Sequence, residues 1–343
     1  YDGCFYLLYQ KSFLLDIAHY ANSSTSSSQS GGFITKLITG LSFSGGCYLT
    51  ALFFSPIMHK KRMGFVIVFT FTLVVITMFM FGGFDDAYLM YNISGIRTGY
   101  VLQTVIFITA GIHLLLLPFL DLWRSRNADS LLLLLLILGI FIFSAFVNWT
   151  TNGRSLLPMV PAVAILVVRQ LEATRPTFTT PTLLASPLLL AATLSLLVTY
   201  GDYLYACSAR QAAREIQQHL TNSSGTAWAE RHWGFQYYTE KSGFKSVNYA
   251  PFDSVRRNGG PLDLQLIQVM PGDTITFWES HRVLPLSDDF IASTQEFTAV
   301  NRPWISTINR KEGAGFYSST YGMLPYYFGS TEAERFLLCT IKK

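Results

Sequence analysis

The chain has 343 residues, half of them hydrophobic, with a mean hydropathy of +0.32 and only 13% charged residues. Soluble domains carry roughly 25% charged residues, so the composition excludes an ordinary soluble protein and indicates a membrane protein. Of the 46 charged side chains, 18 lie in residues 1–200 and 28 lie in residues 201–343. We therefore expect a membrane half followed by a water-soluble half.

The net charge of +4 does not indicate a nucleic-acid-binding protein, because the lysines and arginines cluster only in short loops. The four cysteines show neither metal-ligand spacing nor a disulfide framework, although Cys207 and Cys339 could pair in an extracytoplasmic domain. The first residue is Tyr1, and we expect the chain to be the later part of a longer protein.

Residues 1–32 end in the Ser-rich stretch ANSSTSSSQSGG, which predicts an outer juxtamembrane segment with a flexible linker. Residues 33–200 contain six apolar stretches that are candidate membrane spans, and most are near the length needed to cross a bilayer, about 20 residues at 1.5 Å each. They are Phe33–Phe54, Gly64–Phe81, Gly99–Leu120, Leu131–Trp149, Leu156–Leu171 and Leu183–Tyr200. The fifth is short, so to cross it must borrow residues at its ends or let Arg169 reach the interface, and a re-entrant segment is the alternative.

The loops between these stretches predict an orientation. Seven basic residues follow the first, third and fifth spans, whereas the two loops between them hold only Arg97 and Arg154. The seven are Lys60, Lys61, Arg62, Arg124, Arg126, Arg169 and Arg175. Basic loops face the cytoplasm, so the Arg97 loop, the Arg154 loop and residues 201–343 are predicted to be extracytoplasmic.

Residues 201–343 are predicted to form a small α/β domain with a mixed sheet and helices on at least one face. DYLYACSARQAAREIQQHL has apolar residues at helical spacing, and HWGFQYYTEKSG predicts a helix that ends at Gly243. TAWAE, PGDTITFW, QEFTAV, WISTINR and RFLLCTIKK read as strands. The phosphate-binding patterns GXGXXG and GXXXXGK[ST] are both absent from the sequence.

A single cation, Arg154, lies in the polar gap between two apolar runs in NWTTNGRSLLPMVPAVAIL. A guanidinium at the membrane interface can bind a phosphate bidentately, but it can also anchor a helix end among lipid headgroups. Asn152 and Gly153 beside it are a turn signal, so Arg154 and Asn152 are candidate substrate-binding residues, together with Arg97 in the preceding outer loop.

Other candidates are weaker. The adjacent Asp85 and Asp86 could provide acid–base chemistry or hold a divalent metal, but neighbouring loop residues rarely face one substrate, and a solvated loop tip explains them too. His113 lies in the middle of a span, where it is either functional or bonded to a neighbouring helix. The aromatic residues of WGFQYY and GFYSSTYGMLPYYFG could bind an acceptor or could serve packing.

Three stretches resemble a known family: DLWRSRNADSLLLLLLILGIFIFSAFVNWTTNGRSLLPMVPAVAILVVRQLE, HWGFQYYTEKSG, and the turn Pro271-Gly272-Asp273. In them the chain resembles the C-terminal part of a GT-C membrane glycosyltransferase of family 39. That group contains dolichyl-phosphate-mannose–protein mannosyltransferase-like proteins and is related to the lipid A aminoarabinose transferase.

The resemblance implies an enzyme that moves a sugar from a polyprenyl-phosphate donor to a protein, lipid or glycan acceptor at the outer face of the bilayer. It implies a catalytic carboxylate in an early outer loop, expected in the part that precedes this chain, so this chain alone is expected to be inactive. It also implies that Arg154 contacts the donor phosphate. No cofactor is implied with certainty, although a divalent metal fits the two aspartates.

Two other classes remain open. One is a non-catalytic membrane assembly or sensor protein with an outer α/β domain. The other is a transporter, which the sequence disfavours because the spans are nearly free of charge and show no internal repeat.

Overall fold

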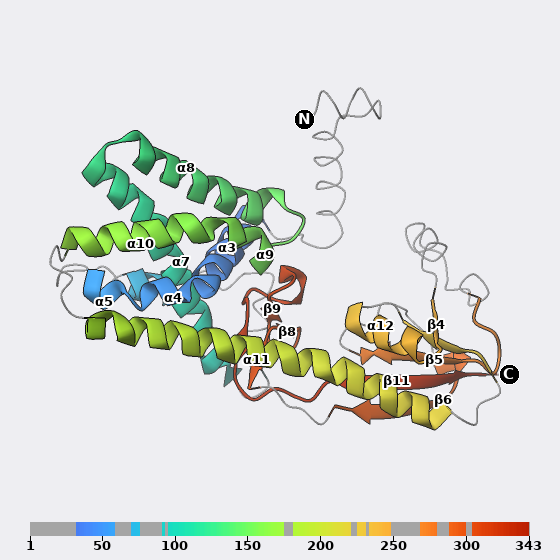
Figure 1. Cartoon of the computed structure of the whole chain (residues 1–343). Coiled ribbons are helices and arrows are strands. Elements are labelled where there is room, and N and C mark those ends of the chain that lie inside the picture. The colour runs from blue at the N-terminus through green and yellow to red at the C-terminus, as the bar shows by residue number, and fades with distance from the viewer. Residues whose placement is uncertain are drawn as a thin grey trace, which may run out of the picture. The chain divides into compact units, whose positions relative to one another are not determined.

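The computed structural model describes residues 32–58, 70–75, 91–92, 95–174, 181–220, 225–230, 233–247, 268–279, 288–299 and 304–342. The chain divides into two compact units (Figure 1). The helical unit contains Tyr1–Thr199 together with Ile305–Gly329, and the sheet unit contains Tyr200–Trp304 together with Ser330–Lys343. The expected soluble domain of residues 201–343 is therefore interrupted, because Ile305–Gly329 returns to the helices.

Four helices of the described chain are long and apolar enough to cross a membrane. They confirm the helices expected at the third to sixth candidate spans, and together with the C-terminal mixed sheet they indicate a membrane protein of the expected general class. Their bounds are α7 Thr98–Ser125, α8 Ala128–Ile142 with a π-helix over Phe143–Val147, α9–α10 over Gly153–Thr174, and α11 Pro181–Leu220. Within the third of these, a 3₁₀ turn at Leu157–Met159 separates α9 (Gly153–Leu156) from α10 (Val160–Thr174).

The first candidate span is a broken helix rather than a continuous one. It consists of α3 (Phe33–Cys47), α4 (Leu49–Leu52) and α5 (Ser55–Met58), and the break falls at Tyr48, whose backbone is not helical (φ −109°, ψ 21°). Of the second candidate span, only residues 70–75 are described, and they are helical. The short hairpin β1 (Tyr91–Asn92) and β2 (Gly95–Ile96) precedes α7.

Small residues let α3 cross α7 at very short range. A Cβ built on Gly45 would lie 1.7 Å from the carbonyl oxygen of Phe107, and one built on Gly111 would lie 2.2 Å from that of Leu41. Contacts between such backbones replace the hydrophobic effect as the source of helix association in a bilayer. The two glycines therefore fix where the broken helix meets α7.

Hydrogen bonds join the C-terminal ends of α7 and α10 to the N-terminal end of α8. Arg169 donates to Asp121 at 3.0 Å, and Asp121 also accepts from Ser130 at 2.6 Å. Arg169, which was expected to reach the interface alone, is thus paired with a carboxylate of the neighbouring helix.

The last predicted span does not end at Tyr200. It continues without a break to Leu220, so α11 is one helix of 40 residues, about 60 Å long at 1.5 Å per residue. Its first half belongs to the helical unit and is largely exposed, whereas Ala209, Ala213 and Ile216 in its second half are buried in the sheet unit. The separate amphipathic helix expected after Asp202 is the continuation of the span.

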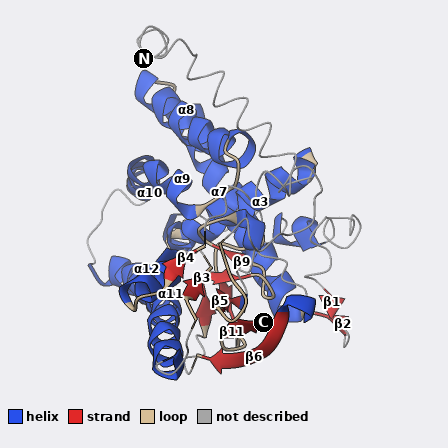
Figure 2. Ribbon diagram, turned by 90° about the vertical axis from the view of Figure 1, so that its right-hand side faces the viewer, coloured by secondary structure: helices blue, strands red, loops and turns tan. Residues whose placement is uncertain are grey.

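The sheet unit contains a five-stranded mixed sheet in the order β4-β3-β5-β11-β6 (Figure 2). The strands are β3 Ala227–Ala229, β4 Lys245–Ser246, β5 Thr274–Trp278, β6 Ile291–Thr298 and β11 Arg335–Ile341. β3 pairs in parallel with both β4 and β5, and helix α12 (Trp233–Lys241) lies between β3 and β4 in the chain. β11 pairs antiparallel with both β5 and β6. Gly243, just after α12, has φ +91°, as expected for a helix C-terminus.

The two faces of the sheet have separate cores. Side chains alternate along each strand, so Phe336 of β11 packs under α11 and α12, whereas Cys339 packs on the opposite face with Ile275 and Phe277. Cys207 and Cys339 are both free, so the pairing left open by the sequence is not formed.

A turn before β5 is held by one carboxylate. Asp273 accepts hydrogen bonds from the backbone N–H groups of Thr226 (2.8 Å) and Met270 (3.0 Å) and from the indole of Trp228 (2.8 Å). Burial alone would raise the pKa of the Asp273 carboxyl, but these donors outweigh it and hold the pKa below its ordinary value. The Pro271-Gly272-Asp273 turn is therefore a structural element.

Candidate functional site

Two helix breaks meet in the helical unit. One is the α3–α4 break at Tyr48, and the other is the 3₁₀ turn between α9 and α10. The Tyr48 hydroxyl joins them by donating to the carbonyl of Leu156 at 2.5 Å. Irregular backbone at membrane depth persists only where protein buries it or where it lines a cavity, so the surroundings of this pair are the first place to look for a site.

A cavity of about 250 Å³ lies beside the two breaks. Its walls come from the α3–α4 break, the α9–α10 turn, α11 and the returning segment Ile305–Gly329. The described residues that line it are mostly apolar, some carry hydroxyl groups and none is charged. They are Gly46, Cys47, Tyr48, Thr50, Gly153, Leu156, Leu157, Val160, Leu194, Ser195, Val198, Thr199, Phe316 and Tyr326.

The segment Ile305–Gly329 closes one side of this cavity. Two small antiparallel pairs shape it, β7 (Ile305–Ser306) with β10 (Tyr327–Phe328) and β8 (Ile308–Asn309) with β9 (Ala314–Gly315). Phe316 accepts a backbone hydrogen bond from Gly153 at 2.8 Å, and its ring lies where a Cβ at Gly153 would stand, 2.6 Å away. A larger residue at position 153 would displace the Phe316 ring from this position.

Tyr326 fixes the same segment to the α3 end. Its hydroxyl donates to the carbonyl of Gly46 at 2.9 Å, and its ring packs edge-on against Phe107. Burial raises the pKa of Tyr326 above its usual range, so the phenol stays protonated and remains a donor.

Buried hydroxyls hold the returning segment to the loop that carries Arg154. Thr150 Oγ1 lies 2.9 Å from Ser318 Oγ and 3.0 Å from Ser319 Oγ, and it accepts from the Ser319 N–H at 2.9 Å. The Thr151 N–H in turn donates to Ser319 Oγ at 3.1 Å. These bonds place Phe316 and Tyr317 on the Gly153–Arg154 turn.

Arg154 is exposed, and its guanidinium lies over the ring of Tyr317, 5.2 Å from the ring centre. Within the described residues it forms no hydrogen bond or ion pair, so its donors remain available to a ligand. Its chain neighbours Gly153, Leu156 and Leu157 line the cavity. A cation thus stands on the turn that forms one wall of an apolar cavity.

The other predicted binding residues have structural tasks. Asn152 is the N-cap of α9 and accepts from the Ser155 N–H at 2.9 Å. Arg97 forms an ion pair with Glu312 of the returning segment and donates to the Lys311 carbonyl at 2.9 Å. Arg97 and Arg154 therefore both meet the returning segment, but the charge of Arg97 is already neutralised.

Asp85 and Asp86 lie outside the described residues. In the part of the chain that is described, no group of three or more histidine, cysteine or acidic side chains could hold a metal ion.

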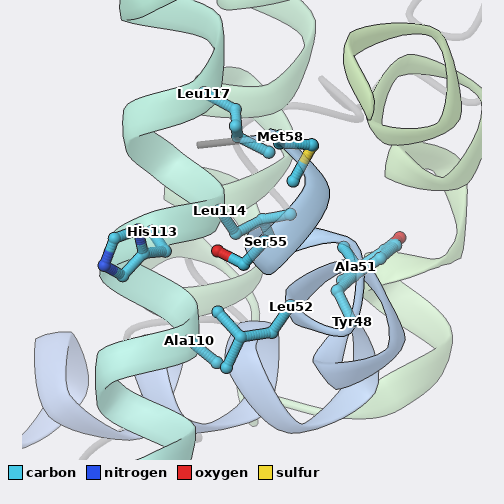
Figure 3. A pocket seen from close by; sticks show the side chains of 9 residues that line it. All are labelled: Tyr48, Ala51, Leu52, Ser55, Met58, Ala110, His113, Leu114 and Leu117. Carbon is cyan, nitrogen blue, oxygen red and sulfur yellow. The ribbon is translucent and has the colours of Figure 1, made fainter. Parts of the chain in front are cut away.

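A second, much smaller pocket of about 20 Å³ lies between α7 and the α4–α5 segment (Figure 3). Space of that size accommodates about one water molecule. Leu52, Ser55 and Leu114 lie between the helices, and Tyr48 and His113 point in opposite directions. His113 is buried, and within the described residues its Nε2 has no hydrogen-bond partner.

The sequence missed Gly46, Tyr48, Phe316 and Tyr326 as site residues. The pair Gly45-Gly46 before Tyr48 was a signal for a helix break inside an apolar run. The aromatic stretch GFYSSTYGMLPYYFG was noticed, and in the structure Phe316, Tyr317 and Tyr326 pack on the helical unit.

No family model, no curated protein and no solved structure matches this chain. The resemblance to family 39 glycosyltransferases is therefore tested by none of these comparisons, and a function has to be inferred from the site itself.

Proposed function

We propose that the chain is part of an integral-membrane glycosyltransferase that uses a sugar linked to polyprenyl phosphate. A hydroxyl of the protein, lipid or glycan acceptor attacks the anomeric carbon. The bond from that carbon to the phosphate oxygen breaks, a base takes the hydroxyl proton, and polyprenyl phosphate leaves as an anion. In this reaction the cavity holds the lipid, and Arg154 stabilises the leaving phosphate.

The observation that carries the proposal is the exposed guanidinium of Arg154 on a turn whose neighbouring residues Gly153, Leu156 and Leu157 line a mostly apolar cavity. A lipid phosphate has the same two parts, an anionic head and an apolar chain. An arginine in a medium of low dielectric constant attracts phosphate more strongly than it does in water, and its planar fork suits two phosphate oxygens.

The broken helices support the same assignment. In membrane proteins, discontinuous helices commonly surround the substrate site because their free backbone groups would otherwise face lipid. Here one hydrogen bond between Tyr48 and Leu156 joins the two breaks, and the remaining space is the cavity.

The charge of the loops gives the expected side of the membrane. Lys60, Lys61, Arg62 and the basic residues that follow α7 and α10 predict a cytoplasmic end, so the Arg154 end would face outward. We accordingly propose an extracytoplasmic site. A reporter fused after Lys343 should behave as extracytoplasmic, and a cytoplasmic signal would contradict this orientation.

The proposal is tested by binding of undecaprenyl phosphate to the purified full chain in detergent, measured by native mass spectrometry. Arg154→Gln should weaken binding about tenfold to a hundredfold, because charge-assisted hydrogen bonds contribute about 1.5–3 kcal/mol. The matched control is Arg126→Gln, an exposed arginine just after α7, at the end that carries Asp121 and Arg169. Equal binding by wild type and Arg154→Gln would overturn the site.

A second function is favoured by one observation: none of the described residues that line the cavity is a carboxylate. A non-catalytic partner protein that presents a lipid phosphate to another enzyme would need no base. Release of polyprenyl phosphate from a labelled sugar donor by the purified protein would exclude this alternative.

A further inference from the structure

We infer that the site binds the phosphate and only the first part of a single hydrocarbon chain, and leaves the rest of that chain in the bilayer. The inference rests on the proposed function and concerns how the site selects its lipid. Ordinary two-chain phospholipids far outnumber a lipid-linked sugar donor, and many of them carry a phosphate. Charge recognition by Arg154 therefore cannot distinguish the ligand alone, and the shape of the cavity has to contribute.

One side of the cavity is built from buried, fixed groups. Leu156 is 1% exposed, and its carbonyl is held by Tyr48. Phe316 lies tightly against Gly153, and Tyr326 is tied to Gly46. Widening the cavity on this side would require these contacts to break, so its width is set by the fold.

The opposite rim is open and apolar. Leu157 and Val160 at the start of α10 are 61% and 47% exposed, and Ser195 and Thr199 on α11 are exposed as well. In a helix that spans a bilayer, such side chains face lipid. A chain can thus enter sideways between α10 and α11 without leaving the hydrocarbon phase.

The volume limits how much of a lipid enters. About 250 Å³ lies below the roughly 300–1,000 Å³ of pockets that enclose a drug-sized molecule. From this volume we expect one chain rather than two to enter, and only the first part of a long polyprenol. The part of the hydrocarbon chain that stays outside the cavity is surrounded by lipid before and after binding, so it contributes almost no binding energy.

The inference predicts a specific selectivity. Farnesyl phosphate and undecaprenyl phosphate should bind alike when concentrations are expressed per bilayer lipid, because they share the headgroup and the first part of the chain. Phosphatidic acid carries a phosphate on two chains and should bind much more weakly. The pattern differs from simple attraction of anions, which would not separate phosphatidic acid from the other two.

The test is competition for radiolabelled undecaprenyl phosphate on the full chain in nanodiscs of zwitterionic lipid. We expect farnesyl phosphate to compete within about threefold of unlabelled undecaprenyl phosphate, and dioleoyl phosphatidic acid to be at least about tenfold weaker. A strong preference for the long chain, or equal competition by phosphatidic acid, would overturn the inference and leave the proposed function standing. Failure of the labelled lipid itself to bind would instead contradict the proposed function.

A pair of neighbouring substitutions on α11 locates the selectivity. Ser195→Trp adds a ring at an exposed position that lines the cavity, so the helix tolerates it while the cavity loses volume. Leu196→Trp adds a ring at the next residue, which is 70% exposed and does not line the cavity. We expect a loss of at least about tenfold in lipid binding for Ser195→Trp and less than about twofold for Leu196→Trp. Equal effects would show that the chain binds elsewhere.

Discussion

The two units interrupt their regular structure in opposite ways. In the sheet unit, the turn before β5 places two backbone N–H groups and one indole N–H on the Asp273 carboxylate. In the helical unit, the breaks at Tyr48 and at Leu157–Met159 share one hydrogen bond and otherwise face a cavity. A turn whose donors all have an internal acceptor is complete in itself. A break that borders a cavity is suited to a ligand, which is why we propose that the function lies in the helical unit.

The comparison depends first on the crossing of α3 and α7, because that contact positions the Tyr48 break. Gly45→Ala would bring a methyl group against the Phe107 carbonyl, where the built Cβ lies only 1.7 Å from the oxygen. Since backbone cannot move aside cheaply, we expect a loss of about 3 kcal/mol or more in stability. The measurement is the fraction of the full chain that remains monodisperse in detergent after heating.

The control for this crossing is Gly139→Ala in the middle of α8. A Cβ there would meet nothing within 4 Å. Alanine is the better helix former by up to about 1 kcal/mol, so this variant should be neutral or slightly more stable. If both glycine variants behaved alike, close packing of α3 on α7 would not be what fixes the break.

The sheet unit can be challenged through Asp273. An asparagine offers only one acceptor oxygen to three donors, so Asp273→Asn should cost about 2–4 kcal/mol. The effect should appear as faster hydrogen exchange in β3 and β5, with the helical unit unchanged. Lipid binding should survive, because no cavity residue belongs to the sheet unit. Loss of lipid binding would contradict the division of roles between the units.

The same residue predicts a dependence on pH. Its pKa in the folded protein is lowered, so its contribution to stability is complete above the unfolded value near about 3.9. That contribution is lost as the pH falls from there through the lower folded pKa. Wild type should therefore lose protection of β3 and β5 below about pH 4, and Asp273→Asn should lose this part of the acid dependence. Identical acid profiles would remove Asp273 as the cause.

Local patterns predicted much of this fold. Runs of apolar residues in the third to sixth candidate spans gave helices, and the turn at Pro271-Gly272-Asp273 preceded β5 as expected. These features depend on neighbours in the sequence. Gly201 and Asp202, in contrast, indicated the end of a span, but α11 passes through them because its second half is buried against the sheet. Tertiary packing outweighed the local signal there.

The site could be predicted only in part. Arg154 is conspicuous as a lone cation in an apolar sequence, and in the structure it is exposed on the turn whose neighbouring residues line the cavity. Its surroundings were not identified, since Phe316 and Tyr317 come from more than 150 residues further along the chain. Arg97 matched the same pattern, yet Glu312 neutralises it. No local pattern separates these two arginines, because the difference lies in which part of the returning segment each one meets.

The smallest expected effect concerns the hydrogen bond between the two helix breaks. Tyr48→Phe removes the donor to the Leu156 carbonyl but keeps the ring that lines the cavity. A buried carbonyl left without a donor costs about 1–2 kcal/mol, so stability should fall slightly. Tyr237→Phe is the control, because Tyr237 is 59% exposed on α12, which belongs to the sheet unit and does not line the cavity.

Lipid binding should weaken severalfold in Tyr48→Phe. The turn released by this substitution carries Arg154 two residues before Leu156, so it holds Arg154 less firmly. If the phenylalanine variant bound undecaprenyl phosphate as wild type does, Arg154 would be positioned by Tyr317 and the Thr150 hydroxyl network alone, and the break at Tyr48 would shape the cavity without orienting its charge.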